Sequence, residues 1–303
     1  MTKKVQVLLS SYNGEKYIEE QIKSLLDQDY PNLHILIRDD GSTDKTLDIL
    51  DKYRTYPHIR VIRGENVGVI KSFFSLLQES DEDADFFAFC DQDDVWLRDK
   101  VSRAITLLSK EDSNIPLMYC SRLTIVDENL NVLRQSKTHR RKPAFANSLV
   151  QNIAVGCTMI INKRCRMLLC KEFPSKVRMH DFWIYQVTSG TGKVIFDHES
   201  RILYRQHSSN AVGAKIGLWK KWKGRMLRYA DIDNRHLIRL QARELQRIFH
   251  HDLTPNNQRI LSSFLILPNG FVKRLFYVLR SEIYRQSKLD SIIFKLMILF
   301  NKI

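Results

Sequence analysis

The segment Phe86-Phe87-Ala88-Phe89-Cys90-Asp91-Gln92-Asp93-Asp94 passes from five apolar residues directly into a run with three acids. A short apolar run bounded by polar residues is typical of a buried strand, and open α/β sheets bind ligands where such strands end. An earlier segment has the same design: an apolar run at residues 33–37 leads into Arg38-Asp39-Asp40-Gly41-Ser42. We therefore expect two buried strands that carry carboxylates at their carboxyl ends.

Strand and helix patterns alternate around these two segments. The apolar run at residues 5–9 and the segment His58-Ile59-Arg60-Val61-Ile62 predict further strands, and apolar residues at helical spacing predict a helix over 69–77. Strands joined by helices form βαβ units with right-handed crossovers, which place the carboxyl ends at one edge of a parallel sheet. The fold class we expect is α/β, a mostly parallel sheet flanked by helices.

Charge is distributed unevenly along the 303 residues. The chain has 48 Lys+Arg and 34 Asp+Glu, for a net charge of +14. Residues 215–303 hold 18 basic and 6 acidic residues, net +12, so residues 1–214 hold 30 and 28, net +2. We expect a near-neutral body over 1–214 and a basic helical region over 215–303. With 44% hydrophobic and 27% charged residues, the composition excludes collagen-like, disulfide-scaffold and disordered classes.

The basic region has the pattern of an interfacial helix. Residues 215–228 interleave Trp219 and Trp222 with Lys and Arg, and residues 292–300 are apolar but short and interrupted by Lys295. No stretch has the roughly 20 apolar residues needed to cross a bilayer. We expect this region to dock on an anionic membrane surface. Covering the catalytic domain or forming a homo-oligomer are the alternatives, and no recognition motif favours nucleic-acid binding.

The cysteines and the N-terminus bear on localisation. None of the five cysteines forms a Cys-x-x-Cys pair, which favours reduced thiols over a zinc site or a redox motif. The first apolar run is too short for the core of a signal peptide. The expectation is a cytoplasmic protein, peripheral on the inner face of the cell membrane.

The acidic clusters suggest metal and ligand binding. In an extended segment alternate residues point the same way, so Asp91 and Asp93 can converge on one Mg²⁺ or Mn²⁺ that bridges a diphosphate. A solvated acidic loop is the alternative. Asp39 and Asp40 can accept hydrogen bonds from a base or a ribose, although a turn capped by Ser42 explains the same pattern.

Two later motifs offer catalytic groups. Asp181 in His180-Asp181-Phe182-Trp183 stands among large apolar side chains, which tend to raise a carboxylate pKa and suit a general base. Capping of a helix is its alternative role. In Tyr204-Arg205-Gln206-His207, the imidazole can complete a metal site and the guanidinium can hold a phosphate, while an ordinary surface histidine remains open.

Four motifs follow one another along the N-terminal half: Ser10-Ser11-Tyr12-Asn13-Gly14, Arg38-Asp39-Asp40-Gly41-Ser42-Thr43-Asp44, Asn66-Val67-Gly68 and Asp91-Gln92-Asp93-Asp94. Together they resemble the N-terminal motifs of family-2 glycosyltransferases with the GT-A fold, and the match spans about residues 1–210. Four further motifs resemble the bacterial rhamnosyltransferase branch: Asp91-Gln92-Asp93-Asp94-Val95-Trp96, Gly156-Cys157-Thr158-Met159, His180-Asp181-Phe182-Trp183 and Tyr204-Arg205-Gln206-His207. Many relatives have Glu where this chain has His180. The Gln-x-x-Arg-Trp motif of processive members is not found in the sequence.

The resemblance implies a role for each motif. The nucleotide-sugar half would span about 1–115 and the acceptor half about 116–214. Asp39 would contact the nucleobase and Asp40 and Asp91 would lie near the ribose. Asp181 would be the catalytic base of a single displacement with inversion. The remaining nucleotide-sugar contacts would come from Ser11, Tyr12, Asn13, Asn66 and Arg205, and the metal ligands would be Asp91, Asp93 and His207.

The resemblance also implies a reaction. An inverting, Mn²⁺- or Mg²⁺-dependent enzyme would move L-rhamnose from dTDP-β-L-rhamnose to a lipid-linked saccharide acceptor in cell-wall or capsular polysaccharide synthesis. A UDP-hexose donor, or a non-catalytic scaffold that binds sugar nucleotides, are the alternatives. A nucleotidyltransferase is disfavoured because no Gly-rich, Lys-bearing phosphate loop follows the first strand.

Overall fold

The computed structural model describes residues 2–139, 141–207 and 232–302, with side chains of the last part from residue 237. The Trp- and Lys-rich segment at 215–228 lies outside the described residues. The described chain packs as two compact units. Unit 1 holds the described parts of residues 1–138, 154–173 and 192–213, and unit 2 those of 139–153, 174–191 and 214–303. This division differs from the expected boundary at residue 214, because residues 139–153 and 174–191 pack with the C-terminal helices.

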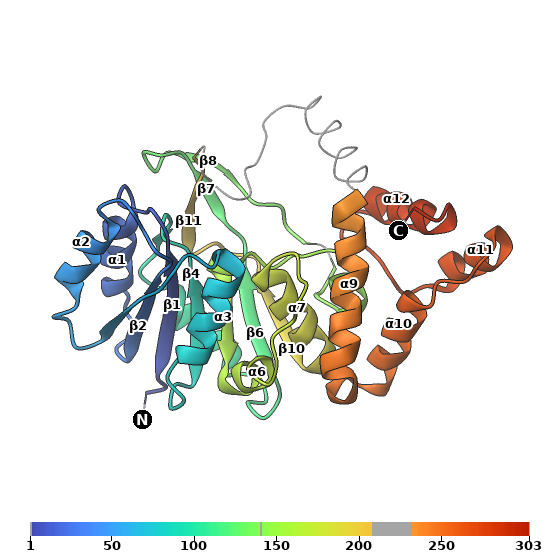
Figure 1. Ribbon diagram of the computed structural model, residues 1–303, viewed down its shortest axis with the longest axis horizontal. Helices are drawn as coiled ribbons and strands as arrows, with labels where there is room; N and C mark the ends of the chain where they lie inside the picture. Colours follow the sequence, from blue (N-terminus) through green and yellow to red (C-terminus); the bar gives the residue numbers. More distant parts are fainter. Residues whose placement is uncertain (1, 140, 208–231, 303) are drawn as a thin grey trace. The chain divides into compact units, whose positions relative to one another are not determined.

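Unit 1 is built on a seven-stranded sheet with the order β10-β6-β9-β4-β1-β2-β3 (Figure 1). All pairs are parallel except those that β9 makes with β4 and β6. The prediction of a mostly parallel sheet is therefore confirmed. The strands are β1 (Val5–Ser11), β2 (Leu33–Asp39), β3 (Ile59–Arg63), β4 (Phe86–Cys90), β6 (Leu117–Ser121), β9 (Ile160–Asn162) and β10 (Lys193–Asp197).

Helices cover both faces of this sheet, because alternate residues of its strands are apolar in both directions. Val7 and Ala88 pack in one core cluster with α1, α2 and α4. On the other face Phe89 of β4 contacts Phe73 of α3, with ring centroids 5.8 Å apart. The helices of unit 1 are α1 (Ile18–Leu26), α2 (Thr46–Tyr53), α3 (Val69–Glu79), α4 (Lys100–Leu108) and α6 (Lys163–Leu169).

A small second sheet in unit 1 has the order β5-β11-β7-β8. Its β11 pairs antiparallel with β5, so Ile202 lies opposite Trp96. This pairing brings the end of β11 next to the acidic loop that follows β4. The strands are β5 (Val95–Trp96), β7 (Thr124–Val126), β8 (Val132–Gln135) and β11 (Ile202–Arg205).

Unit 2 is helical. Trp183 of α7 lies against Phe249 of α9, with ring centroids 5.9 Å apart, and a buried hydrogen bond of 2.8 Å joins Gln241 to Gln186. None of the helices in the described parts of the chain is long and apolar enough to span a membrane. The helices are α5 (Phe145–Ser148), α7 (His180–Thr191), α9 (Ile232–Phe249), α10 (Pro255–Leu265), α11 (Phe271–Arg280) and α12 (Lys288–Leu299).

Two short segments beside the motifs are irregular. Gly156–Thr158 forms a 3₁₀ turn, η1, and β9 begins only at Ile160. The helix after the Asp39-Asp40 motif begins at Thr46, and its first N–H bonds the Asp44 carboxylate at 3.0 Å. Ser42 does not cap this helix and accepts the N–H of Asn13 instead.

Candidate active site

The parallel register brings the predicted nucleotide-binding motifs to one edge of the sheet. Ser11 lies opposite Asp39 in the β1–β2 pair, and Leu9 lies opposite Cys90 in the β1–β4 pair. The residues that follow β1, β2 and β4 therefore start from neighbouring positions, and the loop after β3 carries Asn66. We call this the donor edge: residues 11–14, 39–42, 64–68 and 91–94.

Asp39 is buried at the end of β2 and is bound by its own chain. Its carboxylate accepts the Ser11 hydroxyl at 3.2 Å and the N–H groups of Gly41 and Ser42 at 3.1 and 2.9 Å. Gly41 has a φ of +79°, a conformation that favours glycine. The side chain is 1% exposed and fixes the turn that the sequence suggested.

Asp40 is buried beside Arg38, with which it forms an ion pair. The same carboxylate accepts the N–H groups of Val67 and Gly68 at 3.1 and 2.9 Å, and Arg38 donates to the Glu65 carbonyl at 3.0 Å. Arg38 and Asp40 thus hold residues 65–68 from both ends, with the exposed Asn66 between them. The geometry of this loop depends on a buried charge pair.

Gln92 ties the acidic loop to the end of β1. Its side-chain amide accepts the Tyr12 N–H at 2.8 Å and donates to the Tyr12 carbonyl at 3.0 Å. A Cβ atom at Gly14 would lie 2.3 Å from the Gln92 Oε1, so this close approach requires glycine. Asn13 accepts the Thr43 N–H at 2.8 Å and has a φ of +47°. The loop after β1 is therefore connected to both acidic motifs.

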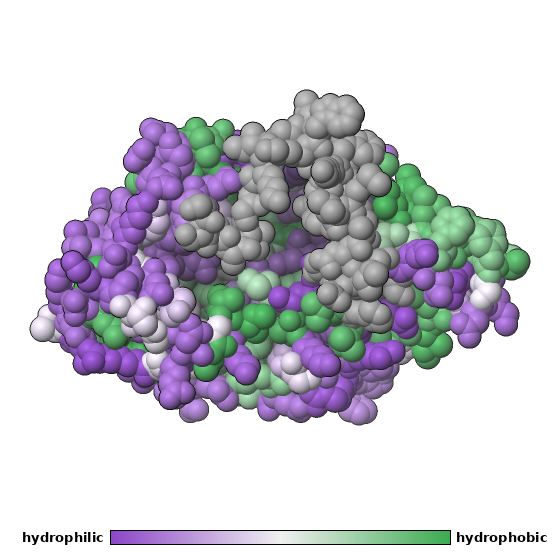
Figure 2. All heavy atoms as spheres, turned by 45° about the horizontal axis from the view of Figure 1, so that its top comes forward, coloured by the Kyte–Doolittle hydropathy of each residue, from purple (hydrophilic) through white to green (hydrophobic). Residues whose placement is uncertain are grey.

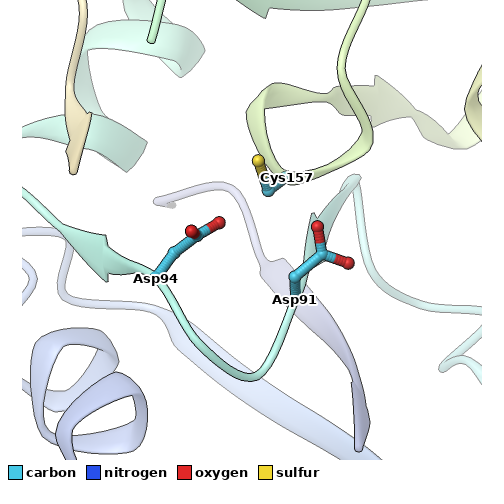
Figure 3. A group of neighbouring side chains, drawn as sticks. All are labelled: Asp91, Asp94 and Cys157. Carbon is cyan, nitrogen blue, oxygen red and sulfur yellow. The ribbon is translucent and has the colours of Figure 1, made fainter. Parts of the chain in front are cut away.

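The loop after β4 bends at Gln92 and Asp93 and does not run extended. The alternation that was expected to bring Asp91 and Asp93 together is therefore absent. Instead Asp94 faces Asp91 beside the Cys157 thiol of η1, with ligand atoms within 4.8 Å of one another (Figure 3). The Asp93 Oδ2 lies 2.9 Å from the Nε2 of His207.

The interior beneath this loop favours neutral groups. Burial raises the pKa of Asp94 well above its usual range, and the charges of Asp93 and Asp91 raise it further. Burial also raises the pKa of the Cys157 thiol. Lys100 is buried with its Nζ 3.0 Å from the Trp96 ring centroid, and burial lowers its pKa to about 7. Asp94 already accepts the backbone N–H of Arg205, and Cys157 offers a soft thiol, so these two groups suit a hard cation less well than the Asp93 carboxylate does.

Arg205 holds the acidic loop, residues 91–94, by hydrogen bonds. Its Nε donates to the Asp93 carbonyl at 2.9 Å, and its guanidinium pairs with Glu20. The backbone N–H of Arg205 donates to the Asp94 carboxylate at 3.1 Å. The guanidinium also lies 4.6 Å from the Tyr17 ring centroid. Because the side chain is only 2% exposed, this geometry favours a positioning role over the phosphate contact that the sequence suggested.

Asp93 and His207 fit a divalent cation. Both side chains are partly exposed, and the His207 ring lies 5.1 Å from the Tyr17 ring. One carboxylate and one imidazole suit Mn²⁺, which accepts nitrogen more readily than Mg²⁺ does. Asp91, the third predicted ligand, lies at the start of the same loop and is grouped with Asp94 and Cys157.

Asp181 lies in unit 2, as the second residue of α7. It is half-buried and accepts the N–H of Phe182 at 2.6 Å. The large apolar neighbours expected from the sequence, Phe182 and Trp183, are buried. Burial lowers the pKa of the preceding His180 to about 3, so its imidazole is neutral at physiological pH.

The sequence reasoning missed Arg38 and Gln92 as supports of the donor edge, and it missed the burial of Lys100 against Trp96. Arg38 had a readable signal, because a charged residue at the end of an apolar strand needs a buried partner. Lys100 follows Trp96 by four residues, a spacing at which a cation can cover a ring, but the pattern does not show which side chain is buried. Gln92 had no signal in the sequence.

Comparisons with known proteins agree with this geometry. Residues 6–165 match the family described as Glycosyl transferase family 2. The chain is 30% identical to dTDP-rhamnosyl transferase RfbG of Shigella flexneri over 97% of this chain and 99% of that protein. It is 28% identical to an Escherichia coli glucosyltransferase, WfgD, over 60% of this chain and 68% of that protein.

Solved structures show the same fold. S. aureus TarS 1–349 in complex with UDP-GlcNAc aligns with a TM-score of 0.61 and 18% identity over 92% of this chain and 76% of that one. A mannosyltransferase from Pyrobaculum calidifontis, in complex with GDP-Man and Mn²⁺, aligns with a TM-score of 0.51 and 17% identity over 100% of this chain and 89% of that one. The chain belongs to glycosyl transferase family 2 and has the GT-A fold.

Proposed function

We propose that this glycosyltransferase moves L-rhamnose from dTDP-β-L-rhamnose to a lipid-linked saccharide acceptor, with inversion, in rhamnose-containing cell-wall or capsular polysaccharide synthesis. The single observation that carries the donor assignment is the similarity to a dTDP-rhamnosyl transferase over nearly the full length of both chains. The acceptor assignment is supported by WfgD, whose name specifies a diphosphoundecaprenol-linked acceptor.

The donor edge supports binding of the nucleotide-sugar. The proposed nucleotide-sugar-binding surface is formed by Ser11, Tyr12, Asn13, Asp39, Asp40, Asn66 and Asp91. Asp39 and Asp40 are bound by their own chain, so we infer that they act mainly by holding the turn and the 65–68 loop in shape. Such preorganisation lowers the cost of ordering a ligand.

Asp93 and His207, together with Asp91, would hold a Mn²⁺ or Mg²⁺ ion. When bound, this cation supplies positive charge against the negative charge that grows on the departing diphosphate. Arg205 would keep the Asp93 backbone in place through its hydrogen bond to the Asp93 carbonyl, and Gln92 would do so by tying the loop to Tyr12. The chain's own part in this step is therefore to fix where the leaving group lies.

Asp181 is the proposed catalytic base. Its carboxylate would take the proton of the acceptor hydroxyl as that oxygen attacks the anomeric carbon opposite the leaving diphosphate. The C–O bond to the acceptor forms as the C–O bond to the diphosphate breaks, which inverts the anomeric centre. The neutral His180 beside it adds no positive charge that would weaken the base.

A lipid-linked acceptor would place the enzyme in the cytoplasm, on the inner face of the membrane. A UDP-hexose donor is the second candidate, because the name of WfgD specifies UDP-Glc and TarS was solved with UDP-GlcNAc. The fold and the proposed mechanism are the same for both donors.

A donor screen tests the proposal. The full chain with Mn²⁺ or Mg²⁺ is given dTDP-β-L-rhamnose, UDP-glucose, UDP-galactose or UDP-N-acetylglucosamine together with a membrane lipid extract, and release of the nucleoside diphosphate is measured. We expect release with dTDP-rhamnose alone. Release with a UDP-sugar alone would refute the rhamnose assignment and leave the family unchanged.

The Asp93 carboxylate gives the sharpest test of metal dependence. We expect Asp93→Asn to lower kcat by about 10³-fold, since a cation at a developing negative charge is worth several kcal/mol. Asp48→Asn, an exposed carboxylate on α2, is the matched control and should leave turnover unchanged. Donor affinity that is independent of both Mn²⁺ and Asp93 would refute the metal assignment.

A further inference from the structure

Unit 2 exposes an unusual concentration of apolar side chains. Ten of the 21 large apolar or aromatic side chains that are exposed in the described residues lie between residues 266 and 300. Figure 2 shows this apolar surface at the right of the molecule, over α11 and α12. A contiguous exposed apolar patch marks a contact site for a partner or a membrane. The ten are Ile266, Phe271, Val272, Leu275, Phe276, Leu279, Leu289, Ile292, Leu296 and Phe300.

Helix α11 presents one continuous apolar stripe. Its exposed apolar residues recur at i, i+1, i+4, i+5 and i+8 from Phe271, which covers an arc of about 140° at 100° per residue. No residue of α11 is buried. The stripe therefore contributes nothing to the core of the described protein, although Phe276 is 56% and Leu279 is 70% exposed.

Helix α12 continues the same surface. Phe294 and Ile298 face inward and are buried, whereas Ile292 and Leu296 point outward. The ring centroids of Phe271, the first residue of α11, and of Phe300, which directly follows α12, lie 6.1 Å apart. We call the exposed apolar residues of α11 and α12 the apolar patch.

Positive charge surrounds the apolar patch. Residues 266–303 contain seven Lys+Arg and two Asp+Glu, net +5. In the described residues no ion pair is formed by Lys273, Arg274, Arg280, Lys288 or Lys295. Lys273 and Arg280 border the apolar stripe of α11 at helical positions about 180–200° from Phe271. Apolar side chains bordered by uncompensated cations are the pattern of a helix that lies in the interface of an anionic bilayer.

We propose that α11 and α12 form the surface by which this enzyme docks on an anionic lipid bilayer, with the apolar patch in the headgroup region and the basic residues on the lipid phosphates. A second copy of the chain fits this surface less well, because a symmetric contact would bring the same net positive charge against itself. The proposal rests on the proposed function only in that a lipid-linked acceptor would lie at such a surface.

Vesicle flotation of the full chain without donor tests the docking surface. We expect binding to vesicles of phosphatidylglycerol and phosphatidylethanolamine, weakened by salt, and little binding to phosphatidylcholine alone. The pair Phe276→Glu with Leu279→Glu should lower vesicle binding about tenfold or more. Folding should be retained because both side chains are exposed, and circular dichroism checks this. Ile292→Glu with Leu296→Glu on α12 provides a second, independent pair.

The matched control is Val132→Glu with Leu133→Glu on β8 of unit 1. These side chains are also exposed, and the change in charge is the same as in the α11 pair. Because β8 lies outside the proposed docking surface, vesicle binding of this variant should stay within about twofold of that of the unchanged chain. If vesicle binding falls equally in the α11 pair and in the β8 pair, the proposal is refuted. Trp219→Ser with Trp222→Ser, which changes the 215–228 segment, separates the two candidate regions. Loss of binding in that variant alone would transfer docking to 215–228 and overturn the assignment to α11 and α12.

Two further outcomes are decisive. If light scattering shows a dimer that the Phe276→Glu and Leu279→Glu changes dissociate, and vesicles are not bound, the patch is an interface between copies and the bilayer proposal fails. If vesicles are bound but dTDP-rhamnose is not turned over in the donor screen, only the proposed function fails. The two proposals are thus tested separately.

Discussion

The donor edge of unit 1 and the apolar patch of unit 2 differ in how their side chains are satisfied. At the donor edge, buried polar groups such as Asp39 and Asp40 are bound by N–H and hydroxyl groups of their own chain. On α11 and α12, large apolar side chains such as Leu279 are exposed and basic side chains surround them. The first region is held in shape by contacts within the chain, whereas the described residues leave the apolar surface of the second exposed.

This difference separates two kinds of recognition. A preformed polar edge suits a small ligand whose reacting atoms must be held in one geometry. An uncovered amphipathic surface suits a large, laterally uniform partner, for which area and charge matter more than geometry. We therefore infer that the donor edge determines which ligand is held and that α11 and α12 determine where the reaction takes place.

The variant with the largest expected effect tests whether unit 2 also contributes a catalytic residue. Asp181→Asn should lower kcat by about 10²–10⁴-fold, because general base catalysis typically contributes that much. Donor affinity, measured by calorimetry, should be unchanged because Asp181 belongs to unit 2 and not to the donor edge.

The matched control for Asp181 is Asp252→Asn, at the end of the 3₁₀ turn η2 (His250–Asp252) of the same unit, which should keep full turnover. Unchanged turnover in Asp181→Asn would remove this residue from the base role and leave unit 2 with surface functions alone.

Breaking the ion pair of the donor edge should have the next largest effect. Arg38→Met leaves the Asp40 carboxylate buried without its cation, and such losses destabilise by about 3–5 kcal/mol. We also expect a raised KM for the donor, because Asp40 holds the 65–68 loop through the Val67 and Gly68 N–H groups. Urea unfolding and steady-state kinetics measure the two effects.

Arg63→Met is the matched control on the adjacent strand. Arg63 pairs with Asp51 on the surface, with both side chains about half exposed, and should cost no more than about 1 kcal/mol. Equal losses in the two variants would show that the donor edge does not depend on its buried charges.

The smallest effect concerns acid stability and the core of unit 2. Burial lowers the pKa of His180 from 6.5 to about 3, so between these pH values the unfolded chain binds a proton that the folded chain does not. The free energy of unfolding should therefore fall as pH decreases from about 6.5 to about 3. At pH 5 the loss is about 2 kcal/mol, from 1.36 kcal/mol per pH unit.

His180→Gln should remove this part of the pH dependence, measured by urea unfolding at pH 7 and pH 5. His198→Gln, an exposed histidine of unit 1, should leave it in place. An identical pH dependence in His180→Gln and the unchanged chain would contradict the buried, neutral imidazole.

Local sequence patterns predicted the first strands of unit 1 and their pairing. The apolar runs before Asp39 and Asp91 predicted buried strands, and the helical spacing between them predicted parallel pairing, which the observed sheet confirms. These predictions succeed because strand and helix periodicity depend on residues close in sequence, and the handedness of βαβ crossovers leaves few topologies. The motifs also identified the family, which the match over residues 6–165 confirms.

Contacts between distant residues were decided only by the tertiary structure. The bend at Gln92 and Asp93 turns Asp94 toward Cys157, and it sets Asp93 beside His207, 114 residues away. Arg205 is buried under the same loop. A strand pattern specifies which face a side chain takes, but not how an irregular loop bends around partners from other elements.

The outward face of α11 and α12 is the second feature that required the structure. Periodicity in the sequence shows that α11 has an apolar side, and it cannot show whether another helix covers that side. The sequence predicted the first strands of unit 1 and their parallel pairing from local spacing, and its motifs identified the family. The tertiary structure decided which carboxylates are bound by their own chain and which apolar surface is exposed, because both depend on what packs against each group.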